Sequence, residues 1–161
     1  MHVFRDALPT DANRCFEIET SAYEGDEAAT HAKITKRIET YPDGFLILEI
    51  SGQVVGFINC GCAYEVEMSD EDFKELIGHD PDAPNVVIMS VVVDPSHQGK
   101  GLSKALMIEF EKRMRSMGKA TIHLMCKEHH VPLYQKFGYC YLQPSASDHG
   151  GMIWHEMSMT L

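Results

Sequence analysis

Residues 93–107, VDPSHQGKGLSKALM, place two glycines and two lysines at the start of an apolar pattern with helical spacing. Gly99 and Gly101 permit positive φ and a close approach of the backbone to a ligand. A helix that begins beside them presents unpaired N–H groups and the positive end of its dipole, which together attract anions. Lys100 and Lys104 add positive charge. The stretch predicts a phosphate-binding loop, but a strand-to-helix turn without a ligand explains these residues equally well.

Two familiar nucleotide-binding motifs do not fit this stretch. A P-loop carries Gly-Lys-Ser/Thr after the four residues that follow its first glycine, and no such triplet occurs here. A dinucleotide-binding fingerprint has a third glycine and an early position in the chain, and both are missing. The sequence therefore argues against both motifs for residues 93–107.

The elements that must position this loop predict a mixed α/β sheet rather than a strict βαβ repeat. Residues 86–93, VVIMSVVV, are apolar on both faces, which is typical of a central covered strand. Residues 101–117 follow as an amphipathic helix that Gly118 ends. We expect further strands at 3–7, 120–126, 139–142 and 152–159, two more within 44–64, and helices at 8–23, 26–42, 69–78 and 130–138.

Two local signals refine these elements. The two strands within 44–64 surround Ser51-Gly52-Gln53, which predicts a hairpin. Ser69 stands three residues before Asp72 and is expected to cap the short helix at 69–78.

The chain has 161 residues and a formal net charge of −10. This length suits one domain, residues 1–161, with one core. An acidic surface repels nucleic acid and anionic lipid and attracts protonated amines, although it also serves solubility alone. The start shows no signal-peptide pattern, and no apolar run approaches the ~20 residues that span a bilayer. We therefore expect a cytoplasmic protein without nucleic-acid or membrane partners.

The five cysteines have irregular spacings and include no C-x-x-C pair. Such a pattern is typical of reduced, mostly buried thiols. Cys60 and Cys62 would share one face of a strand, where packing explains them better than a metal does. The nine histidines include no H-x-x-x-H or H-E-x-x-H motif, so no metal site is predicted.

A second motif, CKEHHVPLYQKFGY at 126–139, follows the glycine-containing loop. With it, residues 86–139 resemble the GNAT superfamily of acetyl-CoA-dependent N-acetyltransferases. The superfamily's phosphate motif is Gln/Arg-x-x-Gly-x-Gly/Ala, and Gln98-x-x-Gly101-x-Ser103 matches it except that Ser103 replaces Gly or Ala. Further segments, including 4–23 and 41–58, look like the arylalkylamine (serotonin) N-acetyltransferase branch.

The resemblance implies a fold and a cofactor site. The fold is the GNAT-type acyl-CoA N-acyltransferase fold, a central, mixed, mostly antiparallel sheet of about seven strands flanked by four or five helices. Backbone N–H groups at the end of the superfamily's central strand bond the thioester carbonyl and the pantetheine arm, which suits an oxyanion that needs fixed donors. The acetyl-CoA site implied in this way, with no metal, comprises Val91, Val92, Val93, Gln98, Gly99, Lys100, Gly101, Leu102, Ser103, Lys104 and Cys126.

Tyr134 matches the superfamily tyrosine that protonates the leaving CoA thiolate. A phenol with a pKa near ~10 donates a proton to a thiolate without being ionised itself beforehand. The alternative is a core tyrosine whose hydroxyl is satisfied by the protein.

The resemblance does not extend to the general base. The arylalkylamine branch has two histidines on the central strand, and the matching positions are Val87 and Met89, which cannot take a proton. Other candidates for the proton path are Glu65, Glu67, Ser90, His123 and His149.

The acceptor site is assigned from the same resemblance. Tyr23 occupies the place of an aromatic residue in the substrate lid, and Met89 and His149 are expected near the acceptor. The carboxylates of Glu24, Asp26 and Glu27 would attract an ammonium group, but acidic residues also favour the start of an ordinary helix.

The function implied by the resemblance is transfer of the acetyl group of acetyl-CoA to a primary amine by direct attack in a ternary complex. The expected acceptor is a small aryl-alkylamine or another cationic amine. The alternatives are a polyamine, an amino-acid-like amine or a protein N-terminus as acceptor, and a non-catalytic module that senses acyl-CoA. Homodimers are frequent among relatives, which makes a homodimer possible here, although nothing in this sequence marks an interface.

Overall fold

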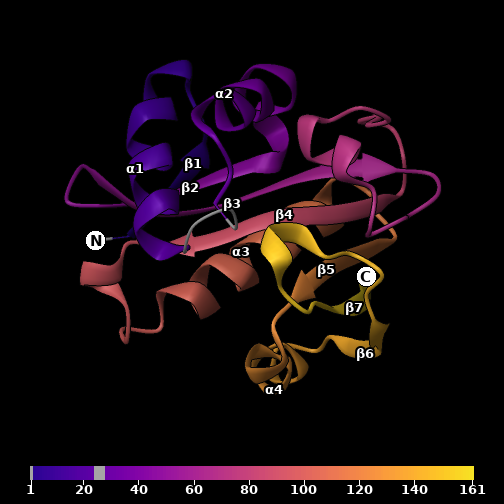
Figure 1. Ribbon diagram of the computed structural model, residues 1–161. Helices are drawn as coiled ribbons and strands as arrows, with labels where there is room; N and C mark the ends of the chain where they lie inside the picture. The colour runs from indigo at the N-terminus through magenta and orange to yellow at the C-terminus, as the bar shows by residue number, and fades with distance from the viewer. Residues whose placement is uncertain (1, 24–27) are drawn as a thin grey trace. The chain divides into compact units, whose positions relative to one another are not determined.

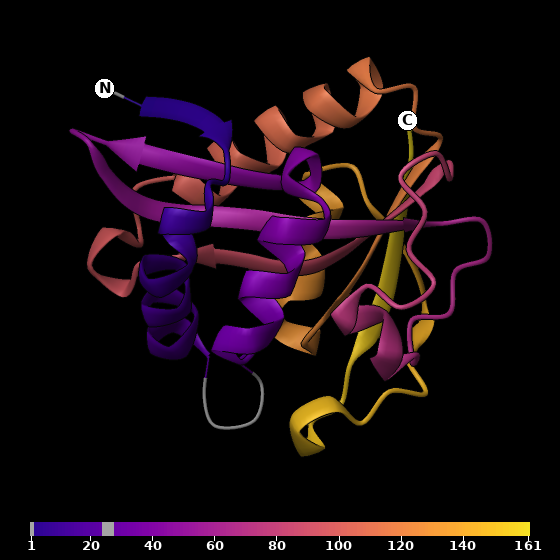
Figure 2. The same cartoon turned by 90° about the horizontal axis from the view of Figure 1, so that it is seen from above.

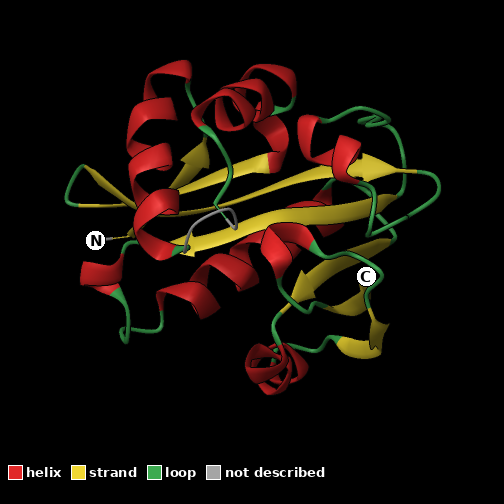
Figure 3. Cartoon of the chain, in the orientation of Figure 1, coloured by secondary structure: helices red, strands yellow, loops and turns green. Residues whose placement is uncertain are grey.

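The computed structural model describes residues 2–23 and 28–161 of the chain. Within them lie a seven-stranded sheet, in the order β1-β2-β3-β4-β5-β7-β6, and four α-helices (Figure 1, Figure 3). β4 and β5 pair in parallel, whereas β1–β2, β2–β3, β5–β7 and β6–β7 are antiparallel. The structure thus confirms the predicted mixed, mostly antiparallel sheet of seven strands.

Most elements lie within a few residues of their predicted bounds. The strands are β1 (His2–Asp6), β2 (Phe45–Ile50), β3 (Gln53–Ala63), β4 (Asn85–Val93), β5 (Thr121–Cys126), β6 (Cys140–Pro144) and β7 (His155–Thr160). The α-helices are α1 (Ala12–Ala22), α2 (His31–Thr40), α3 (Leu102–Ser116) and α4 (Val131–Lys136). Six short 3-10 turns are described as well: η1 (Pro9–Asp11), η3 (Pro42–Gly44), η4 (Glu71–Glu75), η5 (Pro95–His97), η6 (Glu128–His130) and η7 (His149–Gly151).

The chain forms two compact units. The first unit comprises Met1–Cys60 and Ser90–Phe110, and the second comprises Gly61–Met89 and Glu111–Leu161. Each unit therefore combines two separate stretches of the sequence.

In the first unit, β1, β2 and the first part of β3 form an antiparallel ladder, with α1 and α2 side by side against one face of it (Figure 2). Ser51 and Gly52 connect β2 to β3 with φ values of 52° and 78°. Two successive positive φ values are the mark of a type I′ turn, so the predicted hairpin is confirmed. The buried core between helices and strands includes Cys15, Ile18, Ile34, Ile38, Phe45, Ile47 and Phe57.

The start of α2 differs from its prediction. The helix was expected from residue 26, but it begins at His31 because Thr30 is its N-cap and accepts a hydrogen bond from Lys33 N–H at 3.2 Å. Residues 24–27, which include the three predicted acceptor-side carboxylates, lie outside the described part of the chain.

In the second unit, the first residues of β4 pair in parallel with the first residues of β5, from Asn85↔Thr121 to Val87↔His123. β7 then pairs antiparallel with both β5 and β6. A small apolar cluster packs Met68 and Phe73 against Val87. Phe73 and Val87 of this cluster also line the pocket described in the next subsection.

The predicted helix at 69–78 is wrong in type and in its cap. The segment is the 3-10 turn η4, and its cap is Asp70, whose Oδ1 accepts a hydrogen bond from Asp72 N–H at 3.0 Å. Leu76 then takes a left-handed conformation with φ 62°, which ends the 3-10 turn before an α-helix forms. Asp70 competes with Ser69 for the cap because both side chains can bond a nearby N–H.

Two further findings concern the described residues as a whole. Cys15, Cys60, Cys62 and Cys126 are buried free thiols and Cys140 is exposed, in agreement with the prediction of mostly buried, reduced cysteines. None of the described helices combines the length and the apolar composition that a membrane crossing requires.

Candidate functional site

In the first unit, the segment from 94 to 101 connects the end of β4 to α3. Asp94 begins the turn, since its Oδ1 accepts a hydrogen bond from Ser96 N–H at 3.0 Å. Gln98 Nε2 donates to the carbonyl oxygen of Val93 at 3.2 Å. The loop thus folds back onto the end of β4 through its own side chains.

Two glycines with positive φ lead into α3. Gly99 and Gly101 have φ values of 80° and 75°, and apart from chain neighbours no described residue places a heavy atom within 4 Å of a Cβ built on either. These glycines therefore serve the backbone conformation rather than packing. The carbonyl of Gly101 accepts the first helical hydrogen bond, from Ala105 N–H at 3.1 Å. Lys100 and Lys104 are exposed beside the N–H groups of the first turn, which have no acceptor within a helix.

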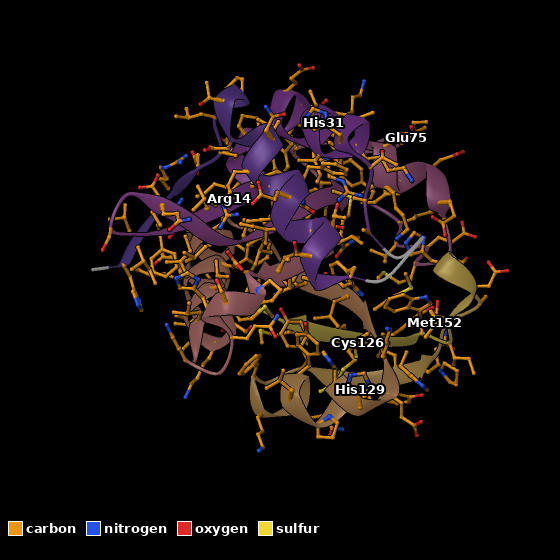
Figure 4. All side chains as sticks on the ribbon, turned by 60° about the vertical axis from the view of Figure 1, so that its left-hand side comes forward. Arg14, His31, Glu75, Cys126, His129 and Met152 are labelled. Carbon is orange, nitrogen blue, oxygen red and sulfur yellow. The ribbon has the colours of Figure 1, made fainter. Side chains whose placement is uncertain are left out.

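Arg14 of α1 holds the start of this loop (Figure 4). Its Nη2 lies 2.6 Å from Asp94 Oδ2, and its Nε donates to the carbonyl of Val54 on β3 at 3.2 Å. The hydrogen bond from Ser96 N–H and then the bond from Arg14 lower the pKa of Asp94. The loop therefore begins at a carboxylate that is ionised at neutral pH.

One edge of β4 faces β3 within the first unit. Asp94 N–H donates to Val55 O at 2.8 Å, and Val92 O lies 2.8 Å from the position of a Cβ built on Gly56. The backbone groups of successive strand residues alternate in direction. The residues on either side of Val92 therefore direct their N–H and C=O groups to the opposite edge.

Val91 and Val93 are those two residues, and side chains bind both of their carbonyl groups. Tyr23 Oη, at the end of α1, donates to Val91 O at 3.1 Å, as Gln98 does to Val93 O. Of the three valines predicted to supply backbone donors, only Val91 and Val93 have the orientation that such a role requires. That they bind a ligand stays a prediction.

A buried polar cluster lies in the first unit beside these residues. Glu19, Arg37, Asn59 and Ser90 are each 3% exposed or less. Arg37 Nη1 donates to Asn59 Oδ1 at 3.4 Å and to Ser90 Oγ at 3.5 Å, and Glu19 Oε2 accepts from Ala29 N–H at 2.6 Å. Burial lowers the pKa of Arg37 to about 10, although the Glu19 carboxylate opposes the shift.

In the second unit, Tyr134 lies half-buried on α4. Its ring meets Phe137 and Tyr139 edge-on, with centroid distances of 6.1 and 6.0 Å. Burial raises the pKa of the Tyr134 phenol, and the neighbouring Cys126 thiol raises it further. Among the residues that the structure describes, none forms a hydrogen bond with the hydroxyl. Tyr134 is therefore a protonated donor that the described protein leaves unused.

Cys126, which Figure 4 labels, is the last residue of β5, and it is near enough to Tyr134 to affect the pKa of that residue. It is 5% exposed, and its Sγ lies 3.7 Å from Met157 Sδ. Burial raises the pKa of its thiol to about 11. Because a thiol is nucleophilic only as the thiolate, Cys126 is unsuited to carry an acyl group at neutral pH.

A pocket of about 410 Å³ opens in the second unit between the end of β3, η4 and β4. Three carboxylates and four apolar residues line it: Glu65, Glu67, Asp70, Ala63, Val66, Phe73 and Val87. It brings together two of the residues that the sequence suggested for the proton path, Glu65 and Glu67, with one of the positions that lack a histidine. Asp70 and Phe73 were not predicted for the site, since nothing in their local sequence distinguishes them from ordinary turn residues.

Three other predicted residues lie outside the described pocket lining. Met89 is half-buried on β4. His149 Nδ1 lies 3.3 Å from Glu71 Oε1 of η4, and its backbone carbonyl accepts from Trp154 Nε1 at 2.8 Å. His123, whose pKa burial lowers, lies 3.0 Å from Thr121 Oγ1 on its own strand. No group of three His, Cys, Asp or Glu side chains able to hold a metal occurs within residues 2–23 and 28–161.

The sequence profile of the acetyltransferase (GNAT) family matches residues 8–139. An acetyltransferase of Pectobacterium atrosepticum is 28% identical over 109 residues, which cover 66% of this chain and 64% of that protein. The chain spans less than two thirds of the length of the curated relatives that it matches.

Solved structures share the fold. The loading GNATL domain of CurA from Lyngbya majuscula has a TM-score of 0.88 at 15% identity, covering 99% of this chain and 98% of that one. The GphF GNAT-like decarboxylase in complex with isobutyryl-CoA has a TM-score of 0.81 at 16% identity and covers 98% of both chains. At such identities the similarity establishes the fold alone.

Proposed function

The chain belongs to the acetyltransferase (GNAT) family, and from this premise we propose that it transfers the acetyl group of acetyl-CoA to a small cationic amine. The loop from 94 to 101 is the observation that supports acetyl-CoA as the cofactor in this proposal. It places two positive-φ glycines and two exposed lysines at the first turn of α3. Backbone N–H groups and positive charge at a helix start suit the pyrophosphate of CoA. The residues from Gln98 to Lys104 are assigned to this role.

The pocket at Glu65 and Glu67 supports a cationic acceptor. Its carboxylates suit an ammonium group, and its apolar wall of Phe73 and Val87 suits a hydrocarbon or aromatic body. An aryl-alkylamine combines the two features. A polyamine would use the carboxylates but would leave the apolar wall in contact with water.

The chemical roles follow from the groups available. Glu65 or Glu67 takes a proton from the ammonium, which Val87 and Met89 cannot do. The amine nitrogen then attacks the thioester carbon, and the N–H groups of Val91 and Val93 stabilise the resulting oxyanion. As the C–S bond breaks, the nitrogen loses its second proton to water and Tyr134 protonates the thiolate of CoA.

A panel of acceptors tests the proposal. We expect CoA thiol release, followed with a disulfide reagent, to be fastest with aryl-alkylamines and slower with polyamines, amino acids and peptide N-termini. Glu65→Gln and Glu67→Gln should each raise the KM for the amine roughly tenfold, because each removes a charge-assisted contact. Glu75→Gln is the matched control, since Glu75 is an exposed carboxylate of η4 outside the pocket lining (Figure 4). An unchanged KM for the amine in both pocket variants would show that the acceptor does not bind in this pocket.

A second candidate is decarboxylation, the activity for which GphF is named, with a carboxyacyl-CoA as the substrate proposed for this chain. The observation that favours it is the lack of a proton acceptor at Val87 and Met89, since loss of CO₂ needs no amine to be deprotonated. The carboxylates of the pocket disfavour it, because they would repel an anionic acyl group. Release of CO₂ from malonyl-CoA without any amine, together with no thiol release on the amine panel, would replace the first proposal by this one.

A further inference from the structure

Tyr23 makes a contact that its predicted place in an acceptor lid does not explain. It follows the last residue of α1, where its backbone is extended, with φ −112° and ψ 147°, and its N–H still bonds Glu19 O at 3.0 Å. Its hydroxyl donates to the carbonyl of Val91 at 3.1 Å, across 68 positions of the sequence. The side chain is thus used to hold a backbone group of β4.

The carbonyl that Tyr23 holds lies on the edge of β4 that points away from β3, and its peptide joins Val91 to Val92. β3 fixes the neighbouring peptide of Val92 on the other edge, as the short approach of Val92 O to Gly56 shows. The Tyr23 contact therefore restrains the orientation of Val91 on the edge where no β3 group does so. With the peptide between Val91 and Val92 held, the preceding peptide, which carries the Val91 N–H, has less freedom to rotate about the Cα that the two peptides share.

The buried cluster explains why Tyr23 can hold this position. Arg37 and Glu19 are both almost fully buried, and both approach the end of α1, where Tyr23 lies. Arg37 also bonds Ser90, the residue directly before Val91. The charges are costly to bury, and one contact of Arg37, the bond to Ser90, is made on the same short piece of β4.

We propose that Tyr23 is a positioning residue: by holding the peptide that joins Val91 to Val92 it limits rotation about the Cα of Val91, so that the N–H group of Val91 in the preceding peptide is a fixed donor for the thioester oxygen. The inference rests on the proposed function and assigns a second role in the same reaction. A donor fixed before the reaction needs no reorganisation in the transition state, and this is the source of its catalytic effect. Tyr23 itself touches neither substrate nor cofactor in this role.

Tyr23→Phe tests the inference, because it removes one oxygen atom and keeps the ring. We expect kcat to fall roughly tenfold, in proportion to one weakened oxyanion contact, with the dissociation constant of CoA and the KM for the amine within about twofold of wild type. Tyr141→Phe is the matched control. It removes a tyrosine hydroxyl that is also hydrogen-bonded, to His155 Nδ1 at 2.8 Å, on the exposed strand β6. Full kcat in Tyr23→Phe, or a loss confined to the KM for the amine, overturns the proposal.

A second measurement separates this proposal from the proposed function. In an HNCO spectrum the cross-peak of the Val92 N–H reports the carbonyl carbon of Val91, and loss of the Tyr23 hydrogen bond should move it upfield. An unchanged Val91 carbonyl shift in Tyr23→Phe overturns the proposal whether or not the protein acetylates amines. If the Val91 carbonyl shift changes in Tyr23→Phe but the wild-type protein acetylates none of the amines, the contact is established. The proposed function is then overturned instead.

Discussion

At the scale of single residues, the useful property of Tyr134 is that it keeps its proton. Burial and the neighbouring Cys126 thiol raise its pKa above the ordinary value of 10.0. A donor with a raised pKa is a weaker acid, but it stays protonated over the whole range in which an amine is a nucleophile. The adjacent thiol cannot take over, since burial raises its own pKa to about 11.

Removal of this hydroxyl should therefore affect chemistry and little else. We expect Tyr134→Phe to lower kcat about a hundredfold or more, the lower end of the usual range for general acid catalysis, and to leave the affinity for CoA unchanged. Because the phenol ionises only above its ordinary pKa, the ratio of wild-type to variant kcat should stay constant up to about pH 10. The measurement is a pH series that follows thioester absorbance. A ratio that falls well below that pH would show that a group of lower pKa is the acid.

The residues of the site differ in how far the sequence could predict them. Short sequence motifs contain Tyr134, Gln98 and the two loop glycines, so the neighbouring residues in the chain identify them. Tyr23 was assigned to an acceptor lid from the family resemblance. Its bond to a backbone carbonyl could not be predicted, because no side-chain pattern reveals such a partner. Asp70 and Phe73 could not be predicted either, because they line the pocket only through the fold of η4.

At the scale of elements, the connection from β4 to α3 depends on backbone conformation more than on side chains. Arg14 and Asp94 fix its first residue, and Gln98 ties its middle back to Val93. The two glycines then turn the chain into the helix without any packing of their own. A Cβ at these positions would meet open space, so its cost is one of φ alone.

Gly101→Ala separates this backbone cost from ligand binding. We expect a loss of about 1–2 kcal/mol in the free energy of unfolding, because an L-residue is strained at positive φ, and a weaker affinity for CoA. Gly118→Ala is the matched control: its φ is 77° against 75°, and it also faces open space, after the far end of α3. Chemical denaturation should show equal losses for both variants, while calorimetric titration with CoA should show weakening in Gly101→Ala alone. Equal affinities of the two variants for CoA would show that the loop does not bind CoA.

Elements with regular patterns were predictable, and those decided by local competition were not. β4 and α3 have unbroken apolar patterns, so their predicted bounds agree with the structure to within a residue or two. η4 was expected as a capped helix, but Asp70 forms the cap and Leu76 turns left-handed. Such an outcome depends on small differences between neighbouring hydrogen-bonding side chains, which the sequence pattern does not rank.

At the scale of the whole molecule, charge is the property that a substrate meets first. The formal net charge is −10, from 24 acidic and 14 basic side chains. A field of this sign raises the local concentration of cations and lowers that of anions. For a cationic amine it would add to the attraction of Glu65 and Glu67 in the pocket.

This field should make the reaction sensitive to salt. We expect kcat/KM for a cationic amine to fall several-fold between about 20 and 500 mM salt, because the screening length shrinks to a few ångströms over that range. Hydroxylamine, which is uncharged at neutral pH, serves as the control acceptor and should show little change. Equal salt dependence for both acceptors would show that the effect lies in the binding of acetyl-CoA.

The division into two units has a consequence for the synthesis of the chain. The chain passes from one unit to the other within β3, within β4 and within α3, so every crossing lies inside a regular element. A ribosome that has made the first 60 residues has made only part of the first unit, and the rest of that unit follows after the first stretch of the second. An N-terminal part that folds before the remainder emerges must therefore include residues 61–89 of the second unit as well as the whole first unit. No single cut of the chain separates the two units, because a cut that leaves one unit whole also leaves a stretch of the other unit attached to it.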